Sequence, residues 1–126
     1  WPFYKDLVSK IKQEFKNKYA VLLAPGPNEV NEAKNLNAKV VLFENQPLDI
    51  KRLISLIYYS KFIISNDTGP AHIASHLNKN GLALFGSHTS AKKVSIENSN
   101  FKAISVENLK NLSIETVIKE IKNNLN

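Results

Sequence analysis

The stretch IISNDTGPAHIAS, residues 63–75, joins an apolar run to a helix-like segment through a polar turn. The apolar run predicts a buried strand, and Asp67, Thr68 and Gly69 follow directly where that strand ends. Pro70 suits the first position of a helix, because its φ angle is already helical and its missing N–H is not needed there. The stretch therefore predicts a strand that leads into a helix, and ligands bind at such strand ends in open α/β sheets.

The same alternation of strand-like and helix-like segments extends along the whole chain. Short apolar runs predict strands, and longer segments with apolar residues three or four positions apart predict amphipathic helices. The alternation favours an α/β fold in which helices cover both faces of one parallel sheet of at least four strands, with the first two strands buried on both faces. The expected strands are residues 19–24, 39–43, 62–65, 82–85 and 101–106, and the expected helices are residues 3–17, 28–36, 50–57, 70–77 and 114–121.

Two of the expected helices begin after residues with typical capping side chains. Asp49 precedes the helix of residues 50–57, and Ser113 precedes the last helix. Each side chain is placed to accept a hydrogen bond from an unpaired backbone N–H of the first turn. These signals predict where both helices begin.

The size and composition of the chain limit the class of protein. With 126 residues, the chain fits one domain with a sizeable core. It has no cysteine for a disulfide or a thiolate metal site, and no apolar stretch is long enough to cross a bilayer. The chain begins with Trp1 and contains no methionine, so we expect a fragment of a longer protein in a soluble, cytoplasmic setting.

The chain carries 17 basic and 11 acidic residues, which gives a net charge of +6. A basic protein often binds nucleic acid or another acidic partner. Most of the lysines, however, fall on the polar positions of helix-like segments, without a dense basic block or interleaved aromatic residues. This distribution is typical of solvated helix faces, and we expect no nucleic-acid partner.

Polar residues follow the expected strands at their carboxyl ends. Gly26 and Glu29 follow the first strand, Glu44 follows the second, Asp67 follows the third, and Gly86 follows the fourth. Parallel strands send their carboxyl ends to one common edge of the sheet. These groups are therefore expected to converge on one ligand although they lie far apart in the sequence.

The turn before the helix of residues 70–77 favours an anion, in particular a phosphate or a pyrophosphate. The backbone N–H groups of Thr68 and Gly69 lie at the positive end of the helix dipole, and Glu29 is suited to accept hydrogen bonds from ribose hydroxyls. The alternative is structural: Asp67 or Thr68 caps the helix, and Gly69 serves the turn. The residues alone leave both interpretations open.

His72 and His76 lie four residues apart in the same expected helix. This spacing suits two metal ligands, but no glutamate follows His72 as in H-E-x-x-H, and no third ligand is apparent. We therefore expect no metal, and we expect His72 to face either the bound anion or the core.

The run SKFIISNDTGPAHIASHLNKNGLALFG, residues 60–86, resembles the signature of the ADP-heptose:lipopolysaccharide heptosyltransferases, glycosyltransferase family nine. In that family an apolar strand leads to D-[ST]-G-x-x-H, and a second strand ends in F-G. Residues 26–29 resemble the family's G-x-x-E turn, residues 48–50 resemble the start of the helix that precedes the signature run, and Trp1-Pro2 resembles the W-P where its second domain begins. The resemblance covers nearly the whole chain.

The resemblance implies a Rossmann-like doubly wound parallel sheet, one half of a two-domain GT-B glycosyltransferase. Residues 1–126 correspond to a single C-terminal nucleotide-sugar-binding domain, with ADP-heptose as the donor and no further cofactor. The missing N-terminal domain is expected to bind a glycolipid acceptor and to supply the catalytic base. The full-length parent would act in lipopolysaccharide core or related surface glycan synthesis, in the cytoplasm and peripherally at the inner membrane. No catalytic residue is assigned within the chain, and we expect the fragment alone to be inactive.

The resemblance also assigns donor-binding residues. Asp67, Thr68 and Gly69 are expected to hold the diphosphate and sugar end of the donor, whereas Glu29 is expected to hold the ribose and Leu48 the adenine face. A carboxylate repels a diphosphate, so Asp67 needs a sugar hydroxyl or a backbone amide as its partner. The implied donor-binding set is Gly26, Glu29, Leu48, Asp67, Thr68, Gly69 and His72.

The chain departs from the family pattern on both sides of the fourth strand. The family has a proline before this strand and F-G-P-T after it, whereas this chain has Lys79-Asn80-Gly81 and Phe85-Gly86-Ser87-His88-Thr89. The selectivity for the sugar is therefore left open. The family's phosphate-binding lysine lies just before the Trp-Pro and is not part of this sequence.

Two other classes of binding domain are built on an α/β sheet. A phosphoacceptor receiver domain has an aspartate after its third strand, but it needs an acidic pair after its first strand to hold Mg²⁺, where this chain has Ala24-Pro25-Gly26. A dinucleotide-binding oxidoreductase domain needs G-x-G-x-x-G after its first strand, and this chain lacks it. The receiver-like signalling module is kept as the alternative.

Overall fold

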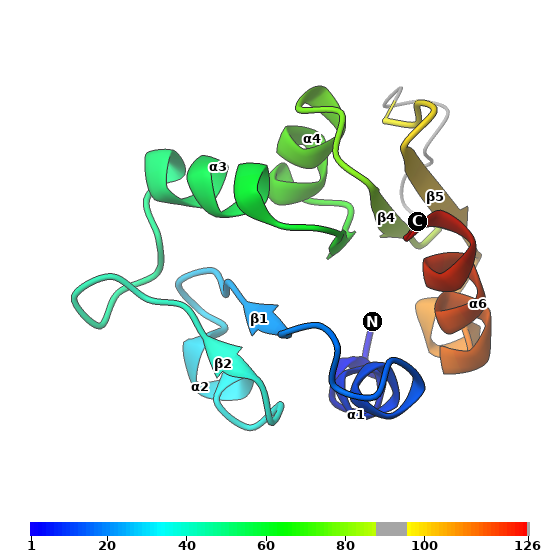
Figure 1. Ribbon diagram of the computed structural model, residues 1–126, viewed down its shortest axis with the longest axis horizontal. Coiled ribbons are helices and arrows are strands. Elements are labelled where there is room, and N and C mark those ends of the chain that lie inside the picture. Colours follow the sequence, from blue (N-terminus) through cyan, green and yellow to red (C-terminus); the bar gives the residue numbers. More distant parts are fainter. Residues whose placement is uncertain (88–95, 126) are drawn as a thin grey trace. The chain divides into compact units, whose positions relative to one another are not determined.

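The computed structural model describes residues 1–87 and 96–125, in which helices and strands alternate along the chain (Figure 1). Neighbouring strands of its sheets run parallel. The chain divides into two compact units, an N-terminal unit, Pro2–Leu53, and a C-terminal unit, Ile54–Asn126 together with Trp1. The predicted α/β fold with parallel strands is confirmed. The strands that were expected in one sheet lie in two sheets, β1-β2 and β3-β4-β5, and this division follows the two units.

The N-terminal unit is built around a pair of short parallel strands, with helices before and between them. Leu22 of the first strand lies opposite Lys39 of the second. The first helix buries Leu7 and Val8, as the spacing of its apolar residues predicts. In chain order the elements are α1 (Tyr4–Glu14), β1 (Leu22–Leu23), α2 (Val30–Ala33) and β2 (Lys39–Val40).

β1 and α2 are both shorter than predicted. The strand expected over residues 19–24 is reduced to β1, and Leu22 is 43% exposed, so the prediction of burial on both faces is wrong. An apolar run favours a strand, but the strand extends only as far as a partner offers N–H and C=O groups. The helix expected over residues 28–36 is reduced to α2. Beyond α2 the backbone hydrogen bonds join residues three positions apart instead of four, as from the Leu36 N–H to the Ala33 carbonyl oxygen.

β2 is also shorter than the predicted strand of residues 39–43, because the chain soon turns back. Phe43 and Gln46 exchange backbone hydrogen bonds of 2.9 and 3.0 Å, and Glu44 between them has a positive φ of 51°. Glu44 therefore lies in a hairpin turn. The expectation that it stands at the carboxyl end of a strand is wrong.

The described residues of the C-terminal unit form a parallel sheet with the strand order β3-β4-β5. Each strand begins and ends within about a residue of its predicted bounds. α4 connects β3 to β4, as the β-α-β pattern predicts. The elements are β3 (Ile63–Asn66), α4 (Gly69–His76), β4 (Gly81–Phe85), β5 (Phe101–Ser105), the short 3-10 helix η1 (Leu109–Asn111) and α6 (Ile114–Asn124).

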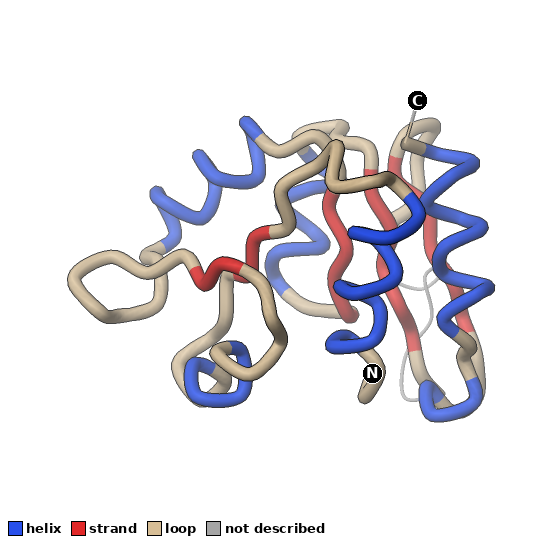
Figure 2. The backbone as a smooth tube through the Cα atoms, turned by 60° about the horizontal axis from the view of Figure 1, so that its bottom comes forward, coloured by secondary structure: helices blue, strands red, loops and turns tan. Residues whose placement is uncertain are grey.

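β4 lies at the centre of the core of the C-terminal unit. Every residue of β4 is buried, and both α4 and α6 pack against it, one on either side of the strands (Figure 2). Phe85, Leu84 and Phe101 are fully buried. Gly81 begins β4, where an added Cβ would lie 2.5 Å from the Phe101 ring and 2.8 Å from the Ile63 carbonyl oxygen. The close approach of neighbouring strands therefore requires a glycine at this position.

Both predicted caps are confirmed. α3 (Ile50–Tyr59) begins after Asp49, whose carboxylate accepts a hydrogen bond of 2.9 Å from the Arg52 backbone N–H. The Ser113 hydroxyl accepts a hydrogen bond of 3.2 Å from the Thr116 N–H at the start of α6. In each case the cap satisfies a backbone donor that the first helical turn leaves unpaired.

The Asp49 cap predicts a pH dependence of stability. Its pKa lies below the usual 3.8, chiefly because of the hydrogen bond from the Arg52 backbone N–H, with the Arg52 side chain adding to the effect. Since folding lowers this pKa, the carboxylate stabilises the folded chain above the usual pKa, and its contribution is lost as the pH falls through the lowered value. We expect Asp49→Asn to lower the urea midpoint near neutral pH, and this difference to disappear in acid.

Urea unfolding followed by circular dichroism, at steps between about pH 7 and about pH 2, measures this pH dependence. Glu107→Gln, which removes an exposed carboxylate from a loop, is the control. An equal pH dependence in both variants would contradict the role assigned to Asp49.

Candidate functional site

The turn between β3 and α4 forms as predicted. β3 ends at Asn66, and α4 begins at Gly69. Thr68 precedes the helix with extended backbone angles, and its carbonyl oxygen accepts hydrogen bonds of 3.1 and 3.4 Å from the N–H groups of Ala71 and His72. The N-terminus of α4, with the partial positive charge of the helix dipole, therefore lies directly beside the carboxyl end of β3.

The Thr68 side chain does not cap α4. Its hydroxyl lies 3.0 Å from the Ser65 hydroxyl, and it donates to the Asn66 carbonyl oxygen at 3.4 Å. The structural alternative in which the Thr68 side chain caps the helix is therefore wrong. Ser65, which sequence reasoning missed, helps to hold this side chain in place. Ser65 could have been noticed in the sequence as a polar residue within an apolar strand.

Gly69 is not required by the fold. Its φ is not positive, and the position that a Cβ would take is open space, with no heavy atom of the described residues within 4 Å apart from the chain neighbours and the backbone of its own helix. This open space lies at the positive end of α4, the arrangement that accommodates a phosphate close to backbone N–H groups. The interpretation in which Gly69 merely serves the turn is therefore not supported by its geometry.

Asp67 is paired with His72. Asp67 Oδ1 lies 3.6 Å from His72 Nε2, with 17% of the Asp67 side chain and 39% of the His72 side chain exposed. When His72 is protonated, the two side chains form an ion pair that offsets the negative charge of Asp67. The turn thus contains a polar partner for the carboxylate. Sequence reasoning placed His72 beside an anion or in the core, and it missed this pair.

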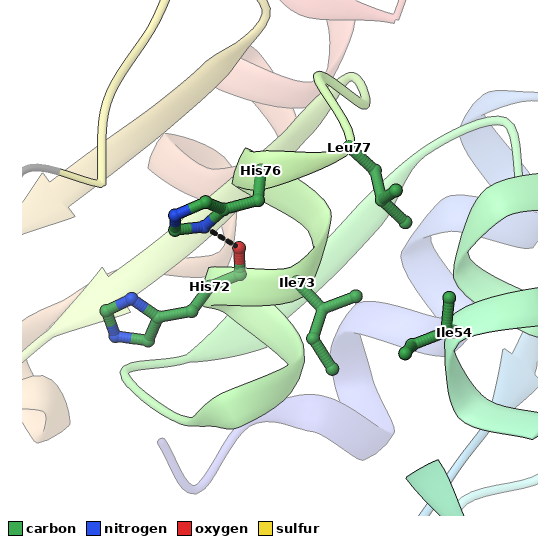
Figure 3. Close-up of a pocket in the computed structure, with 5 residues that line it drawn as sticks. All are labelled: Ile54, His72, Ile73, His76 and Leu77. Carbon is green, nitrogen blue, oxygen red and sulfur yellow. Dashed lines mark hydrogen bonds between the residues drawn. The ribbon is translucent and has the colours of Figure 1, made fainter. Parts of the chain in front are cut away.

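α3 and α4 line a shallow groove of about 310 Å³ in the C-terminal unit (Figure 3). Ile73 and Leu77 of the α4 segment point toward Ile54 of α3, whereas His72 and His76 lie one above the other on another side of α4. His76 Nδ1 lies 2.8 Å from the His72 carbonyl oxygen, so one nitrogen of this ring is engaged in a hydrogen bond. In the part of the chain that the structure describes, no three histidine, cysteine or acidic side chains come together as metal ligands.

Gly26 and Glu29 close a compact turn in the N-terminal unit. The Gly26 N–H donates to the Glu29 carboxylate at 3.0 Å, and the Glu29 N–H donates to the Gly26 carbonyl oxygen at 3.1 Å. Glu29 also stands at the start of α2, where its carbonyl oxygen accepts a hydrogen bond from the Ala33 N–H. The carboxylate thus braces the turn while Glu29 remains exposed.

Tyr4 is a neighbour of this turn that sequence reasoning missed. Burial raises the pKa of its hydroxyl above the usual 10.0, and the negative charge of Glu29 raises that pKa further. The hydroxyl therefore stays protonated at physiological pH, close to a carboxylate that it can stabilise. No motif marks Tyr4, because it occupies an ordinary position of the amphipathic helix α1.

The predicted donor-binding residues are distributed over both units. Convergence of the two groups on one ligand stays a prediction, as does the single nucleotide-sugar-binding domain over residues 1–126. The chain positions 88–89, where the sequence departs from the family pattern, lie outside the described residues. The C-terminal unit holds Asp67, Thr68, Gly69 and His72, and the N-terminal unit holds Gly26, Glu29 and the half-buried Leu48.

The fold and the turn at α4 define a class of protein. Parallel strands alternate with helices, and a helix N-terminus lies beside the carboxyl end of a strand, as in the Rossmann-like half of a GT-B glycosyltransferase. Residues 1–122 match the family model of glycosyltransferase family 9 (heptosyltransferase). The chain belongs to this family, and the resemblance seen in its motifs is confirmed.

Solved heptosyltransferases share the fold of this chain. The chain is similar to E. coli heptosyltransferase WaaC with ADP, with a TM-score of 0.85 and 20% identity over 98% of this chain and 39% of that one. It is also similar to E. coli ADP-heptose LPS heptosyltransferase II, with a TM-score of 0.81 and 21% identity over 99% of this chain and 41% of that one.

The chain thus spans about two-fifths of the length of these two structures, and the predicted fold of one GT-B half is confirmed. No curated protein gives a significant match. The receiver-like alternative finds no support in the family or in the fold.

Proposed function

We propose that this chain is the donor-binding part of a glycosyltransferase that transfers heptose from ADP-heptose. Its membership of glycosyltransferase family 9 supports the reaction class. The observation that carries the proposal is the open space at Gly69, which lies at the positive end of α4 and beside the Asp67–His72 pair. A diphosphate is the anion that suits this position in a nucleotide-sugar transferase.

Each residue of the proposed site has a chemical role. Backbone N–H groups around Gly69 bind the diphosphate, and His72 adds positive charge when it is protonated. Asp67, whose charge is then offset by His72, accepts a hydrogen bond from a hydroxyl of the sugar. Glu29 accepts hydrogen bonds from the ribose hydroxyls, and Leu48 covers the adenine face.

The solved structures support the choice of donor. The WaaC structure contains ADP, and the second structure is that of an ADP-heptose heptosyltransferase that acts on lipopolysaccharide. We infer the same donor for this chain, without a further cofactor, and a product in the lipopolysaccharide core or a related surface glycan. Departing diphosphate would be stabilised by the groups that bind it in the donor.

The proposal assigns the acceptor to the rest of a longer protein. Transfer requires an acceptor hydroxyl held in line with the anomeric carbon and a base that takes its proton. An N-terminal domain that binds a glycolipid would supply both groups. We place this parent protein in the cytoplasm, peripherally at the inner membrane. Among the described residues, no helix has the length and apolar character needed to span a bilayer.

Calorimetric titration with ADP, GDP and UDP tests the proposal on this chain. We expect weak binding of ADP that is nevertheless about tenfold tighter than binding of GDP or UDP, a difference of about 1.4 kcal/mol. A sugar-transfer assay with ADP-heptose and a glycolipid acceptor is expected to show no turnover by the chain alone. Transfer by the chain alone, or tighter binding of GDP or UDP than of ADP, would overturn the assignment.

A matched pair of variants locates the nucleotide in the same experiment. His72→Gln is expected to weaken ADP binding about fivefold, because it removes an imidazole that adds positive charge beside the diphosphate when it is protonated. His76→Gln changes the same residue type one helical turn away and is expected to leave the affinity unchanged. Equal losses in the two variants would place the nucleotide elsewhere.

A further inference from the structure

An exposed surface lies at the C-terminal ends of α3 and α4, within the C-terminal unit. Its apolar members on α3 are Ile54, Tyr58 and Tyr59, which are 38%, 57% and 85% exposed. The half-buried Leu77 directly follows α4, and a lysine lies shortly after each of the two helices, exposed after α3 and half-buried after α4. These six residues form what we call the tyrosine–lysine patch: Ile54, Tyr58, Tyr59, Lys61, Leu77 and Lys79.

Direct contacts link Tyr58 to both Tyr59 and Lys79, and Ile54 and Leu77 line one groove. The rings of Tyr58 and Tyr59 meet edge to face with their centroids 5.0 Å apart. Lys79 Nζ lies 5.8 Å from the centroid of the Tyr58 ring and donates a hydrogen bond of 2.8 Å to the Tyr58 carbonyl oxygen. Ile54 and Leu77 face each other across the groove between α3 and α4 (Figure 3). The two aromatic rings and the Lys79 ammonium group are thus held side by side.

The sequence around the patch carries little negative charge. Residues 50–87 contain a single acidic residue, Asp67, and this residue is paired with His72. The net charge of the whole chain is +6. The patch therefore favours a partner that combines dense negative charge with an apolar layer. The basic residues of the same stretch are Lys51, Arg52, Lys61 and Lys79, and Arg52 pairs with Asp49 just before the stretch.

We propose that the tyrosine–lysine patch docks on the surface of an anionic phospholipid bilayer. Tyrosine rings are stable at the level of the headgroups, where their apolar body is buried and their hydroxyl stays hydrated. Lysines keep their ammonium groups among the phosphates while their methylene groups cover apolar surface. The inference rests on the peripheral membrane location proposed above, and it names the surface that produces this location.

The size and the place of the patch favour a bilayer over a protein partner. A stable protein–protein interface uses roughly 20–30 residues on each side, far more than the patch offers. Docking on a bilayer needs fewer residues. The negative charge of the bilayer attracts basic side chains over about 8–10 Å, and individual aromatic rings can insert into its interface. The patch lies at the C-terminal end of α4, about 12 Å along the helix from Gly69.

Co-sedimentation with lipid vesicles tests the patch on the whole chain. Vesicles of phosphatidylglycerol and phosphatidylcholine are expected to bind the chain, and vesicles of phosphatidylcholine alone are not. Binding is expected to weaken as the salt concentration rises. The double variant Lys61→Gln, Lys79→Gln is expected to bind about 30-fold more weakly, which corresponds to about 1 kcal/mol per lysine. The double variant Tyr58→Ser, Tyr59→Ser is expected to lose about tenfold or more.

A charge-matched control makes the test specific. Lys110→Gln combined with Lys119→Gln removes the same charge from exposed positions of η1 and α6, and it is expected to bind vesicles like the unchanged chain. Lys61→Gln alone leaves the hydrogen bond from Lys79 intact and is expected to bind about fivefold more weakly. Urea unfolding of every variant separates lost binding from lost folding.

Several results would overturn the proposal. These are equal losses in the two lysine pairs, equal binding to both kinds of vesicle, and unchanged binding after the tyrosine replacements. Sedimentation velocity adds another: a dimer that becomes a monomer when Tyr58 and Tyr59 are replaced would identify a second copy as the occupant. ADP binding, measured in the same variants, is expected to be unchanged. Lost vesicle binding with intact ADP binding in the lysine and tyrosine variants therefore tests docking separately from the proposed function.

Discussion

Replacing Gly81 by alanine is expected to destabilise the chain by about 3 kcal/mol or more. Gly81 begins β4 between two neighbouring strands, where an added Cβ would lie 2.5 Å from Phe101 Cε2 and 2.8 Å from the Ile63 carbonyl oxygen. Neither neighbour has room to move, because Phe101 is fully buried and the Ile63 oxygen belongs to the backbone of β3. Urea unfolding followed by circular dichroism measures the loss.

Two further variants show whether these contacts cause the loss. Gly69→Ala adds the same methyl group in open space at the start of α4, so it is expected to change the free energy of unfolding by less than about 1 kcal/mol. Adding Phe101→Leu to Gly81→Ala relieves the contact with the ring but keeps the contact with Ile63. The cost of Gly81→Ala is therefore expected to fall in that background without vanishing. A cost of Gly81→Ala below about 0.5 kcal/mol would contradict the packing described for β4.

Replacing Gly69 by valine is expected to weaken ADP binding about tenfold or more, while the free energy of unfolding changes by less than about 1 kcal/mol. The fold makes no demand for glycine here, since its φ is not positive and the space beyond its Cα is open. A branched side chain would fill the space through which a phosphate approaches the N-terminus of α4. Calorimetry with ADP and urea unfolding of the same samples measure the two effects separately.

A graded series at this position provides the control. Gly69→Ala adds one methyl group and is expected to weaken ADP binding less than valine does. Gly26→Ala, in the turn of the N-terminal unit, would place its Cβ at an ordinary 3.5 Å from the Glu29 carboxylate and is expected to keep the fold. Parallel losses of stability and of ADP binding in Gly69→Val would show that the glycine serves the turn, and the proposed diphosphate position would then be wrong.

The starts of helices could be predicted from the sequence because they depend on neighbours along the chain. Asp49 and Ser113 cap the helices that follow them, and each receives its hydrogen bond from a backbone N–H three residues later. Pro70 lies in the first turn of α4, where its ring favours the helical φ. The order of strands and helices in the C-terminal unit could also be predicted, because apolar runs are signals from residues that are close in the sequence.

The extent of the strands in the N-terminal unit could not be predicted in this way. Residues 19–24 have the composition of a buried strand, yet β1 covers Leu22–Leu23 alone, and Leu22 is substantially exposed. A strand exists only where a partner meets its N–H and C=O groups, and the partner here is β2. β2 in turn is followed by the hairpin at Glu44. The left-handed φ of Glu44 cannot be predicted from the pattern of apolar residues.

Some features of the candidate site could likewise be predicted from the motif, whereas others are visible only in the structure. The D-T-G-x-x-H spacing identified Asp67, Thr68, Gly69 and His72, and the family match confirms the family that this motif indicated. The Asp67–His72 pair, the contact of Thr68 with Ser65 and the position of Tyr4 near Glu29 came from the structure. These contacts depend on side-chain orientation, which spacing along the chain does not define.

By itself, the sequence determined the family, the alternation of strands and helices, the helix caps and the turn that begins α4, because each of these is encoded by residues within a few positions of one another. The tertiary structure alone decided which glycine serves packing and which leaves open space. The sequence does not distinguish the surroundings of Gly81 from those of Gly69. Gly81 lies between Phe101 and Ile63, which are about twenty residues away on either side, whereas none of the described residues beyond its own helix and chain neighbours places an atom within 4 Å of a Cβ at Gly69. The difference is physical: local signals act through the backbone of one turn, whereas the space around a side chain is set by strands that meet only when the sheet has formed.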